Sequence, residues 1–259
     1  MRSTSIRYPR KVTKSHYLNV NTADERGGIV QESILEEHVE AALREWVSVR
    51  AEQKERSEAR GNAQQGNRAA VVSGKHLDAV NALIIAEIKR IAGPGLEFRE
   101  GRAATLPGYY RATKNWDLVV LREGVPLLAV EYKSMFGSEA KNLNNRADEI
   151  FGMAEDSRQA EAHGLLPENM KRAYVFIMGI TPKSTKPVTT ANGVGAVDPA
   201  FRHASYLDRA AIMCERMRET HLFHLVWAIG VHDETLEYRE TRPSVGWSRF
   251  AADLIALFG

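Results

Sequence analysis

The spacing of hydrophobic residues predicts helices toward both ends of the chain. Apolar residues recur every three or four positions from about residue 30 to 60 and again from about 76 to 92, as they do along one buried face of a helix. Gly93-Pro94-Gly95 ends the second of these segments. Similar segments predict further helices at residues 145–161, 206–220 and 247–258.

Short, mostly apolar segments between these helices predict strands. They lie at residues 96–99, 109–112, 117–121, 126–132, 173–180, 222–231 and 235–240. Arg122-Glu123-Gly124 is a short polar connection that predicts a hairpin, and residues 181–204, rich in Gly, Pro and Thr, predict a long loop. Helices before and after a central group of strands indicate an α/β or α+β fold. We expect the former, with a mixed central sheet flanked by helices.

Composition changes this picture little. A chain of 259 residues forms one large domain or two small ones, and its 44% hydrophobic and 26% charged residues exclude a mainly disordered chain, a collagen and a simple coiled coil. We expect a single domain in which residues 1–75, a basic arm and helical extension, precede a core at 76–259. No apolar run approaches the ~18 residues of a membrane span, and the basic start lacks the apolar segment of a secretory signal.

Charge and cysteine content leave the partner open. The single cysteine, Cys214, makes no intrachain disulfide and no cysteine-based zinc site, which fits the reducing cytoplasm. A net charge of only +2 does not exclude nucleic acid, because the signature of such binding is local clustering of Lys and Arg. Residues 1–15 hold five basic residues and no acid, so this segment is either a frayed terminus or an arm that contacts phosphate.

The chemistry of the chain is concentrated in residues 115–134. Asp117 begins one apolar strand, and Glu131 and Lys133 end the next. Because they are two apart in a strand, Glu131 and Lys133 point to the same face, and a short hairpin would bring Asp117 beside Glu131. Mg²⁺ takes oxygen ligands from one or two carboxylates, and a neighbouring lysine can hold an attacking water. This set suits phosphodiester hydrolysis and resembles the PD-(D/E)xK nuclease core.

An E-x-K triplet alone is weak evidence, because most such triplets lie on solvated helix faces. Here the charged pair interrupts an otherwise apolar strand, where charge is costly without partners. The flanking segments narrow the match: LPGYYRATKNWDLVV at 106–120, VEYKS at 130–134 and NNRADEIFG at 144–152 closely resemble the XhoI-type restriction endonuclease family. The strong resemblance covers about residues 106–156 and is looser elsewhere. The SMFGSEAKNL segment departs from the Gly- and Asn-rich loop associated with the family.

The resemblance implies a Mg²⁺-dependent type II restriction endonuclease. Such an enzyme would cut both strands of a palindrome, CTCGAG in family members of this kind, and leave 5′ overhangs. A cognate DNA methyltransferase would protect the host without binding the enzyme. A palindrome favours a two-fold symmetric homodimer. The apolar face of helix 247–258 could serve its interface, with core packing as the alternative.

Several further residues are candidates for the site. Glu87 is either a third acid or a surface residue that pairs with a nearby cation. Asn145 could cap a helix, and Arg146 could contact a phosphate or a carboxylate, since helix N-termini bind phosphate readily. The candidate DNA-binding residues are Lys141, Asn142, Asn144, Asn145, Arg146, Lys183, Lys186 and Arg202. Two alternative functions stay open: a repair or structure-specific nuclease with the same core, and a non-catalytic DNA-binding protein.

Overall fold

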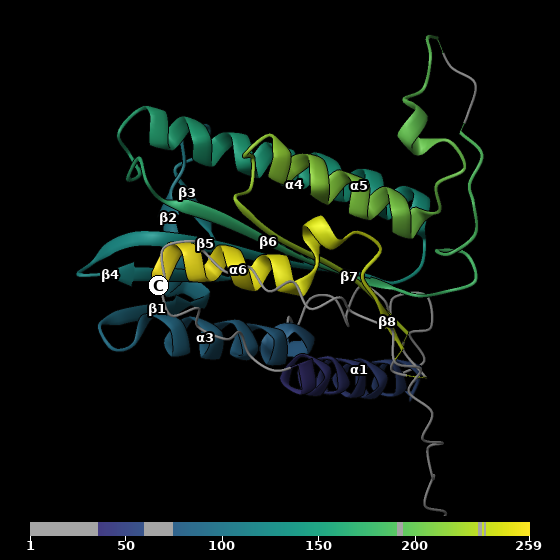
Figure 1. The fold of residues 1–259 in the computed structure, drawn as a ribbon, viewed down its shortest axis with the longest axis horizontal. Helices are drawn as coiled ribbons and strands as arrows, with labels where there is room; N and C mark the ends of the chain where they lie inside the picture. Colours follow the sequence, from purple (N-terminus) through teal and green to yellow (C-terminus); the bar gives the residue numbers. More distant parts are fainter. Residues whose placement is uncertain (1–35, 60–74, 191–193, 233–234, 236) are drawn as a thin grey trace, which may run out of the picture. The chain divides into compact units, whose positions relative to one another are not determined.

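The computed structural model describes residues 36–59, 75–190, 194–232, 235 and 237–259 (Figure 1). The helices are α1 (Glu36–Ala59), α3 (Asp78–Ala92), α4 (Glu139–Ala162), α5 (Tyr206–Glu219) and α6 (Trp247–Phe258). The strands are β1 (Leu96–Glu100), β2 (Thr105–Pro107), β3 (Thr113–Asn115), β4 (Leu118–Arg122), β5 (Val125–Met135), β6 (Lys171–Gly179), β7 (Leu225–Val231) and β8 (Tyr238–Arg239). The 3-10 turns are η1 (Lys75–Leu77), η2 (Gly101–Ala104), η3 (Pro199–Phe201) and η4 (Pro243–Val245).

The predicted mixed sheet is confirmed. Six strands lie in the order β1-β4-β5-β6-β7-β8, and β2 and β3 form a separate two-stranded sheet. Strands β5, β6 and β7 are parallel neighbours, whereas β1, β4 and β8 run antiparallel to the strands they pair with. The parallel strands are joined through α4 and α5, as parallel pairing requires long crossover connections.

Helices cover both faces of the sheet, as the pattern predicted (Figure 1). One core cluster joins α1, α3 and α6 to the sheet, and the other joins α4 and α5 to its opposite face. The helical extension is part of this packing, because Trp46 of α1 is fully buried in the first cluster. Each central strand therefore supplies alternate residues to two separate cores.

The hairpin that positions the candidate acids is also confirmed. Glu123 and Gly124 both have positive φ, 52° and 78°, at the turn between β4 and β5. Successive positive φ values are typical of the tight turns that match the twist of paired strands. The turn brings the start of β4 beside the middle of β5, where Leu118 pairs with Val130.

Two element predictions around the site were wrong. Residues 109–112 form no strand but the turn between β2 and β3, where the N–H groups of Tyr109 and Tyr110 donate to Asp156 instead of to a neighbouring strand. Helix α4 begins at Glu139 and not near residue 145. Gly137 and Ser138, both with positive φ, turn the chain after β5, and the polar residues that follow form helix without a clear apolar pattern.

The C-terminal helix was predicted with correct bounds but serves the core. Phe250 and Leu254 of α6 are fully buried, and Phe250 packs near Trp227 of β7 with a ring-centroid distance of 6.4 Å. The core-packing alternative is therefore confirmed for Phe250 and Leu254, whose burial leaves them unavailable to a dimer interface. No helix in the described part of the chain is long and apolar enough to cross a membrane. The basic segment 1–15 lies outside the described residues.

Candidate active site

The hairpin of β4 and β5 brings the three predicted catalytic residues together. Asp117 immediately precedes β4, and its N–H donates to the carbonyl of Val130 at 3.2 Å. The Asp117 carboxylate in turn accepts the N–H of Tyr132 at 2.7 Å. These two bonds hold Asp117 beside the segment of β5 that carries Glu131 and Lys133.

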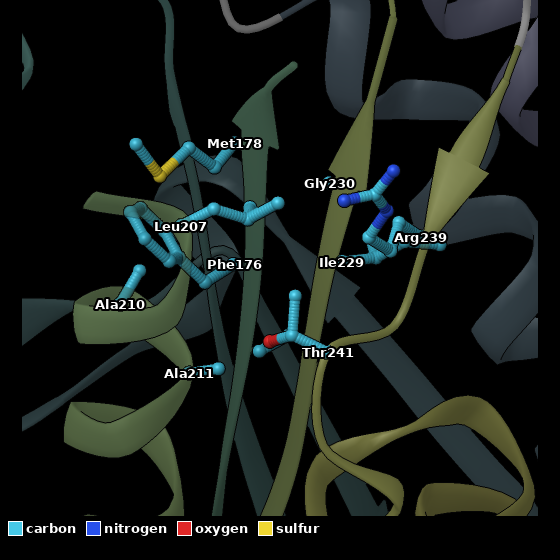
Figure 2. A pocket seen from close by; sticks show the side chains of 10 residues that line it. Phe176, Met178, Leu207, Ala210, Ala211, Ile229, Gly230, Arg239 and Thr241 are labelled. Atoms are coloured by element: carbon cyan, nitrogen blue, oxygen red, sulfur yellow. The ribbon is translucent and has the colours of Figure 1, made fainter. Parts of the chain in front are cut away.

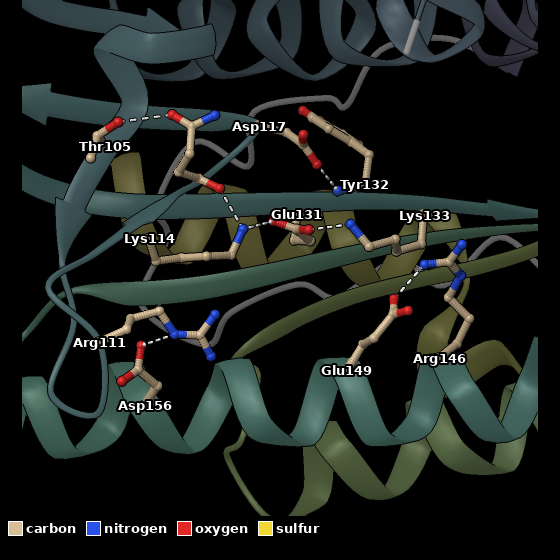
Figure 3. Close-up of polar contacts among 11 residues, drawn as sticks. Thr105, Arg111, Lys114, Asp117, Glu131, Tyr132, Lys133, Arg146, Glu149 and Asp156 are labelled. Carbon is tan, nitrogen blue, oxygen red and sulfur yellow. Dashed lines mark hydrogen bonds and ion pairs between the residues drawn. The ribbon is translucent and has the colours of Figure 1, made fainter. Parts of the chain in front are cut away.

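Alternation along β5 separates the charged residues from the structural ones. Tyr132 belongs to the core cluster under α3, where its hydroxyl donates to Asn81 at 2.8 Å. Ser134 points the same way, and its hydroxyl lies 2.7 Å from a ring nitrogen of His76. Glu131 and Lys133 lie at the intervening positions and pair with each other (Figure 3). Because side chains alternate across a strand, the E-x-K spacing gives both charged groups one face.

Glu131 is the centre of the polar cluster. It is 4% exposed and pairs with two ammonium groups, one from Lys133 and one from Lys114 on β3, whose Nζ lies 3.0 Å from Oε2. Figure 3 shows the two lysines approaching Glu131 from opposite sides. Lys114 was not among the residues predicted from the sequence. Its only signal was a basic residue in the segment that resembles the family, because β2 and β3 were not recognised as a hairpin.

The electrostatics of Asp117 fit a cation site. Residue Asp117 as a whole is exposed, but surrounding protein atoms desolvate its carboxyl in part, and this raises its pKa. The negative charge of Glu131 raises the pKa further, so the two acids lie close enough to repel. A divalent cation between them would relieve this repulsion, and carboxylate oxygens are the donors that Mg²⁺ prefers. Asp117 and Glu131 therefore fit such an ion by their chemistry.

The comparison with known proteins agrees with this chemistry. The family model "Restriction endonuclease XhoI" matches residues 56–237, which include the hairpin and all three catalytic candidates. The chain belongs to the XhoI restriction endonuclease family. The predicted resemblance is thus confirmed.

Individual relatives share about a third of the aligned residues. The type II restriction enzyme XhoI of Xanthomonas vasicola is 34% identical over 160 residues, which are 60% of this chain and 64% of the relative. BstVI of Geobacillus stearothermophilus is also 34% identical over 160 residues, 59% of this chain and 71% of the relative. AbrI of Azospirillum brasilense is 36% identical over 106 residues, 40% of this chain and 48% of the relative. No solved structure gives a significant match to the chain.

Glu87 does not join the two acids in this XhoI-family chain. It is fully buried on α3 and pairs with Arg90, three residues along the helix, at 2.9 Å. Within the described residues, no three His, Cys, Asp or Glu side chains form a group that could hold one metal ion. Of the two alternatives for Glu87, the structure shows the pairing with a nearby basic residue, but Glu87 is buried and not on the surface.

The candidates near α4 lie within the helix and not in a loop before it. Asn142 donates to the carbonyl of Gly137 at 2.9 Å and so ties the helix to the preceding turn. Asn145 lies within the second turn of α4, so the prediction that it caps the helix was wrong. Arg146 pairs with Glu149 and projects from α4 toward the sheet (Figure 3). The other two candidates on α4, Lys141 and Asn144, are exposed, and so is Asn145.

A buried tyrosine lies beside Glu131 in the sheet. Tyr174 of β6 is the register partner of Glu131, and its fully buried hydroxyl has no hydrogen-bond partner among the described residues. Burial raises the pKa of Tyr174 well above its ordinary value, and the charges of Arg146 and Glu131 act on the same hydroxyl. Arg146 on α4 and Glu131 on β5 therefore lie on the same side of the sheet as this hydroxyl.

The candidates in the long loop after β6 lie at its two ends. Lys183 is 63% exposed and pairs with the buried Glu139 at the start of α4, with Nζ 3.5 Å from the carboxylate. That carboxylate also accepts the hydroxyl of Thr181 at 3.0 Å. Lys186 and Arg202 are exposed. The pairing joins the first part of the loop to α4, whose later residues flank the site.

A small cavity in the described part of the chain lies away from the candidate acids. It lies between α5, β6, β7 and β8, is lined mainly by apolar side chains such as Met178 and Leu207, and measures about 10 Å³ (Figure 2). This volume holds about one water molecule. The cavity is therefore a packing defect and too small for a nucleotide or cofactor.

Proposed function

We propose that this protein is a Mg²⁺-dependent type II restriction endonuclease that cuts double-stranded DNA. The observation that carries the proposal is the meeting of Asp117, Glu131 and Lys133 at one end of the β4–β5 hairpin in a member of the XhoI family. Two acids and a lysine at one point of a sheet suit hydrolysis of a phosphodiester. The same set gives a non-catalytic DNA-binding protein no advantage.

Asp117 and Glu131 would hold the metal ion. A bound Mg²⁺ lowers the pKa of water and stabilises negative charge on the phosphate. The chain's contribution is to keep two carboxylates close together in spite of their repulsion. The Tyr132 N–H fixes Asp117, and burial with two lysines fixes Glu131.

Lys133 would act at the reacting phosphate. Its side chain is 25% exposed, so its ammonium is held by Glu131 yet is open to solvent and substrate. From there it can donate a hydrogen bond to the attacking water and to a phosphate oxygen. A positive charge at this point stabilises the transition state more than the ground state, because negative charge develops there during the reaction.

The finer specificity rests on the family resemblance. We propose that the protein recognises CTCGAG and leaves 5′ overhangs, and that a cognate methyltransferase protects the host DNA from it. Contacts to phosphates and bases would come from basic and amide residues of α4 and of the loop after β6. Those residues are Lys141, Asn142, Asn144, Asn145, Arg146, Lys183, Lys186 and Arg202. Residues 1–259 would act as a single domain. The protein would work in the cytoplasm, where it meets the DNA that it cuts.

We further propose that the protein works as a homodimer. A two-fold palindrome is best matched by two copies related by a two-fold axis, with one active site for each strand. Light scattering on the free protein and on its DNA complex tests this. A strict monomer in both states would contradict it.

Digestion of a sequenced plasmid with and without Mg²⁺ tests the function. We expect discrete bands whose ends map to one palindrome and show 5′ overhangs. A smear, or cuts only at junctions and ends, would indicate a structure-specific or repair nuclease with the same core. Binding without any cutting would indicate a non-catalytic DNA-binding protein. A plasmid methylated at the mapped site is the control, because it should resist digestion.

A further inference from the structure

Lys114 belongs to the polar cluster but has no place in the E-x-K motif. Its Nζ lies 3.0 Å from Oε2 of Glu131, while Lys133 takes Oε1 of the same carboxylate. The Lys114 side chain is 18% exposed, compared with 25% for Lys133. A single buried carboxylate therefore has an ammonium group on each of its oxygens.

The position of Lys114 is built by contacts at both ends of the β2–β3 hairpin. At the turn, the buried carboxylate of Asp156 on α4 accepts the N–H groups of Tyr109 and Tyr110 at 3.0 and 2.7 Å and pairs with Arg111 at 3.0 Å. At the other end, the N–H of Trp116 donates to the carbonyl of Ala104 at 3.0 Å.

The space around the turn is equally tight. A Cβ atom on Gly108 would lie 2.8 Å from the Asp156 carboxylate, so the turn lies directly against α4. The ammonium of Lys114 lies 5.5 Å from the ring centre of the buried Trp116. A lysine held over an indole ring by an anchored hairpin is not a stray surface charge.

A divalent cation changes the balance of charge at Glu131. Without the cation, two ammonium groups compensate the two acids Asp117 and Glu131. With it, two ammonium groups and a doubly charged ion would share one carboxylate, and Coulomb repulsion at such distances is strong in a partly buried site. A lysine can move away from the ion because its charge sits on a flexible four-carbon stem. A phosphate of the bound DNA would then be the anion that pairs with the Lys114 ammonium.

We propose that Lys114 is a second lysine of the active site, which pairs with Glu131 in the free protein and moves to a DNA phosphate when the metal ion and DNA bind. This inference rests on the proposed nuclease function. In the free protein Lys114 competes with the metal ion for Glu131. In the complex it neutralises a phosphate oxygen at or next to the scissile bond.

The test compares Lys114→Met and Lys114→Arg with Lys89→Met. Met keeps the length of the side chain without its charge, and Lys89 is an exposed lysine of α3, which lies on the opposite side of the sheet. Three quantities are measured: the affinity of the DNA-free protein for Mn²⁺ by calorimetry, the salt dependence of duplex binding in Ca²⁺, and single-turnover cleavage at saturating Mg²⁺. Urea unfolding confirms that each variant is folded.

Removing the competing charge should tighten Mn²⁺ binding about 3- to 10-fold in Lys114→Met. Cleavage at saturating Mg²⁺ should fall about 10- to 100-fold, as for loss of one preorganised charge at a transition state. The slope of log affinity against log salt should fall by about one phosphate contact. Lys114→Arg should recover part of the cleavage rate, and Lys89→Met should match the wild type.

Two outcomes would overturn the inference. If cleavage in Lys114→Met is unchanged, the pair with Glu131 only supports the hairpin. If cleavage falls but Mn²⁺ affinity does not rise, Lys114 does not compete with the metal ion. Failure of the wild-type protein to cut DNA under any of these conditions would instead contradict the proposed function, so the two failures are distinguishable.

Discussion

The two faces of strand β5 differ sharply in chemistry although they are built from neighbouring residues. On one face Glu131 and Lys133 lie between the buried residues Ala129 and Met135 and meet Lys114 in a partly exposed polar cluster. On the other, Leu128, Val130 and Tyr132 are at most 3% exposed in the core under α3. A strand that is fixed by a dry core on one side can hold charges at set positions on the other. The comparison predicts that substitutions on the polar face change catalysis and those on the apolar face change stability.

The largest effect is expected at Glu131. Glu131→Gln keeps the size of the side chain but removes the charge that would bind the metal ion, so cleavage should fall by about 1000-fold or more. Metal-free DNA binding should be equal or tighter, because one negative charge no longer faces phosphate. Single-turnover cleavage beside a gel-shift titration measures both. Asp117→Ala should lose cleavage in the same way. Cleavage at the wild-type rate in either variant would contradict the assignment of these residues to the active site.

Substitution of Lys133 should also lower cleavage without lowering DNA binding, but by a smaller factor. Lys133→Ala should lose about 100-fold or more in cleavage while it keeps site-specific binding, because its charge acts mainly in the transition state. Lys133→Arg should rescue poorly, since a planar guanidinium does not reproduce a compact ammonium. The same two assays apply. If binding is lost as completely as cleavage, Lys133 is a DNA-binding residue and not a catalytic one.

The apolar face of β5 should show the opposite result. Leu128 is fully buried, and Leu128→Ala should lower the free energy of unfolding by about 2–5 kcal/mol through lost burial and the cavity left behind. Urea unfolding measures this change. At a temperature where the variant stays folded, its single-turnover cleavage should be close to that of the wild type. A large catalytic loss without loss of stability would contradict the division between the two faces.

The smallest effect concerns the pH dependence of stability at His76, whose ring contacts Ser134 on the apolar face of β5. Burial, with a contribution from Arg50, lowers the pKa of His76 to about 4 from an ordinary value of 6.5. Between these values the unfolded chain binds a proton that the folded protein excludes. The free energy of unfolding should therefore fall by about 2–3 kcal/mol as the pH drops through this window, and the contribution should be complete above pH 6.5.

His76→Gln should flatten this dependence, because Gln does not titrate. The measurement is urea unfolding at several pH values between 4 and 7, with His163→Gln, a substitution at an exposed site, as the matched control. His224, whose pKa is also lowered to about 4, should account for part of the remaining slope. An unchanged slope in His76→Gln would show that folding does not lower the pKa of His76.

Local pattern was sufficient for much of the fold and for the centre of the site. The alternation in β5 follows from the two-residue period of a strand, and the Arg122-Glu123-Gly124 turn follows from the positive φ values that a tight hairpin needs. Together they predicted that Asp117, Glu131 and Lys133 lie close to one another, because all three belong to one hairpin. The bounds of α6 were also predicted from its local apolar face.

What local pattern could not decide depended on contacts between distant segments. The turn at 109–112 takes its shape from Asp156, more than 40 residues along the chain, and so its apolar tyrosines were taken for a strand. Lys114 joins Glu131 only because that anchored hairpin lies over the sheet. Glu87 is buried on α3, where it pairs with Arg90. The sequence thus determined the local arrangement of the three candidate residues through short-range periodicity. Tertiary packing decided which other charges reach them, because long-range contacts leave no fixed spacing in the chain.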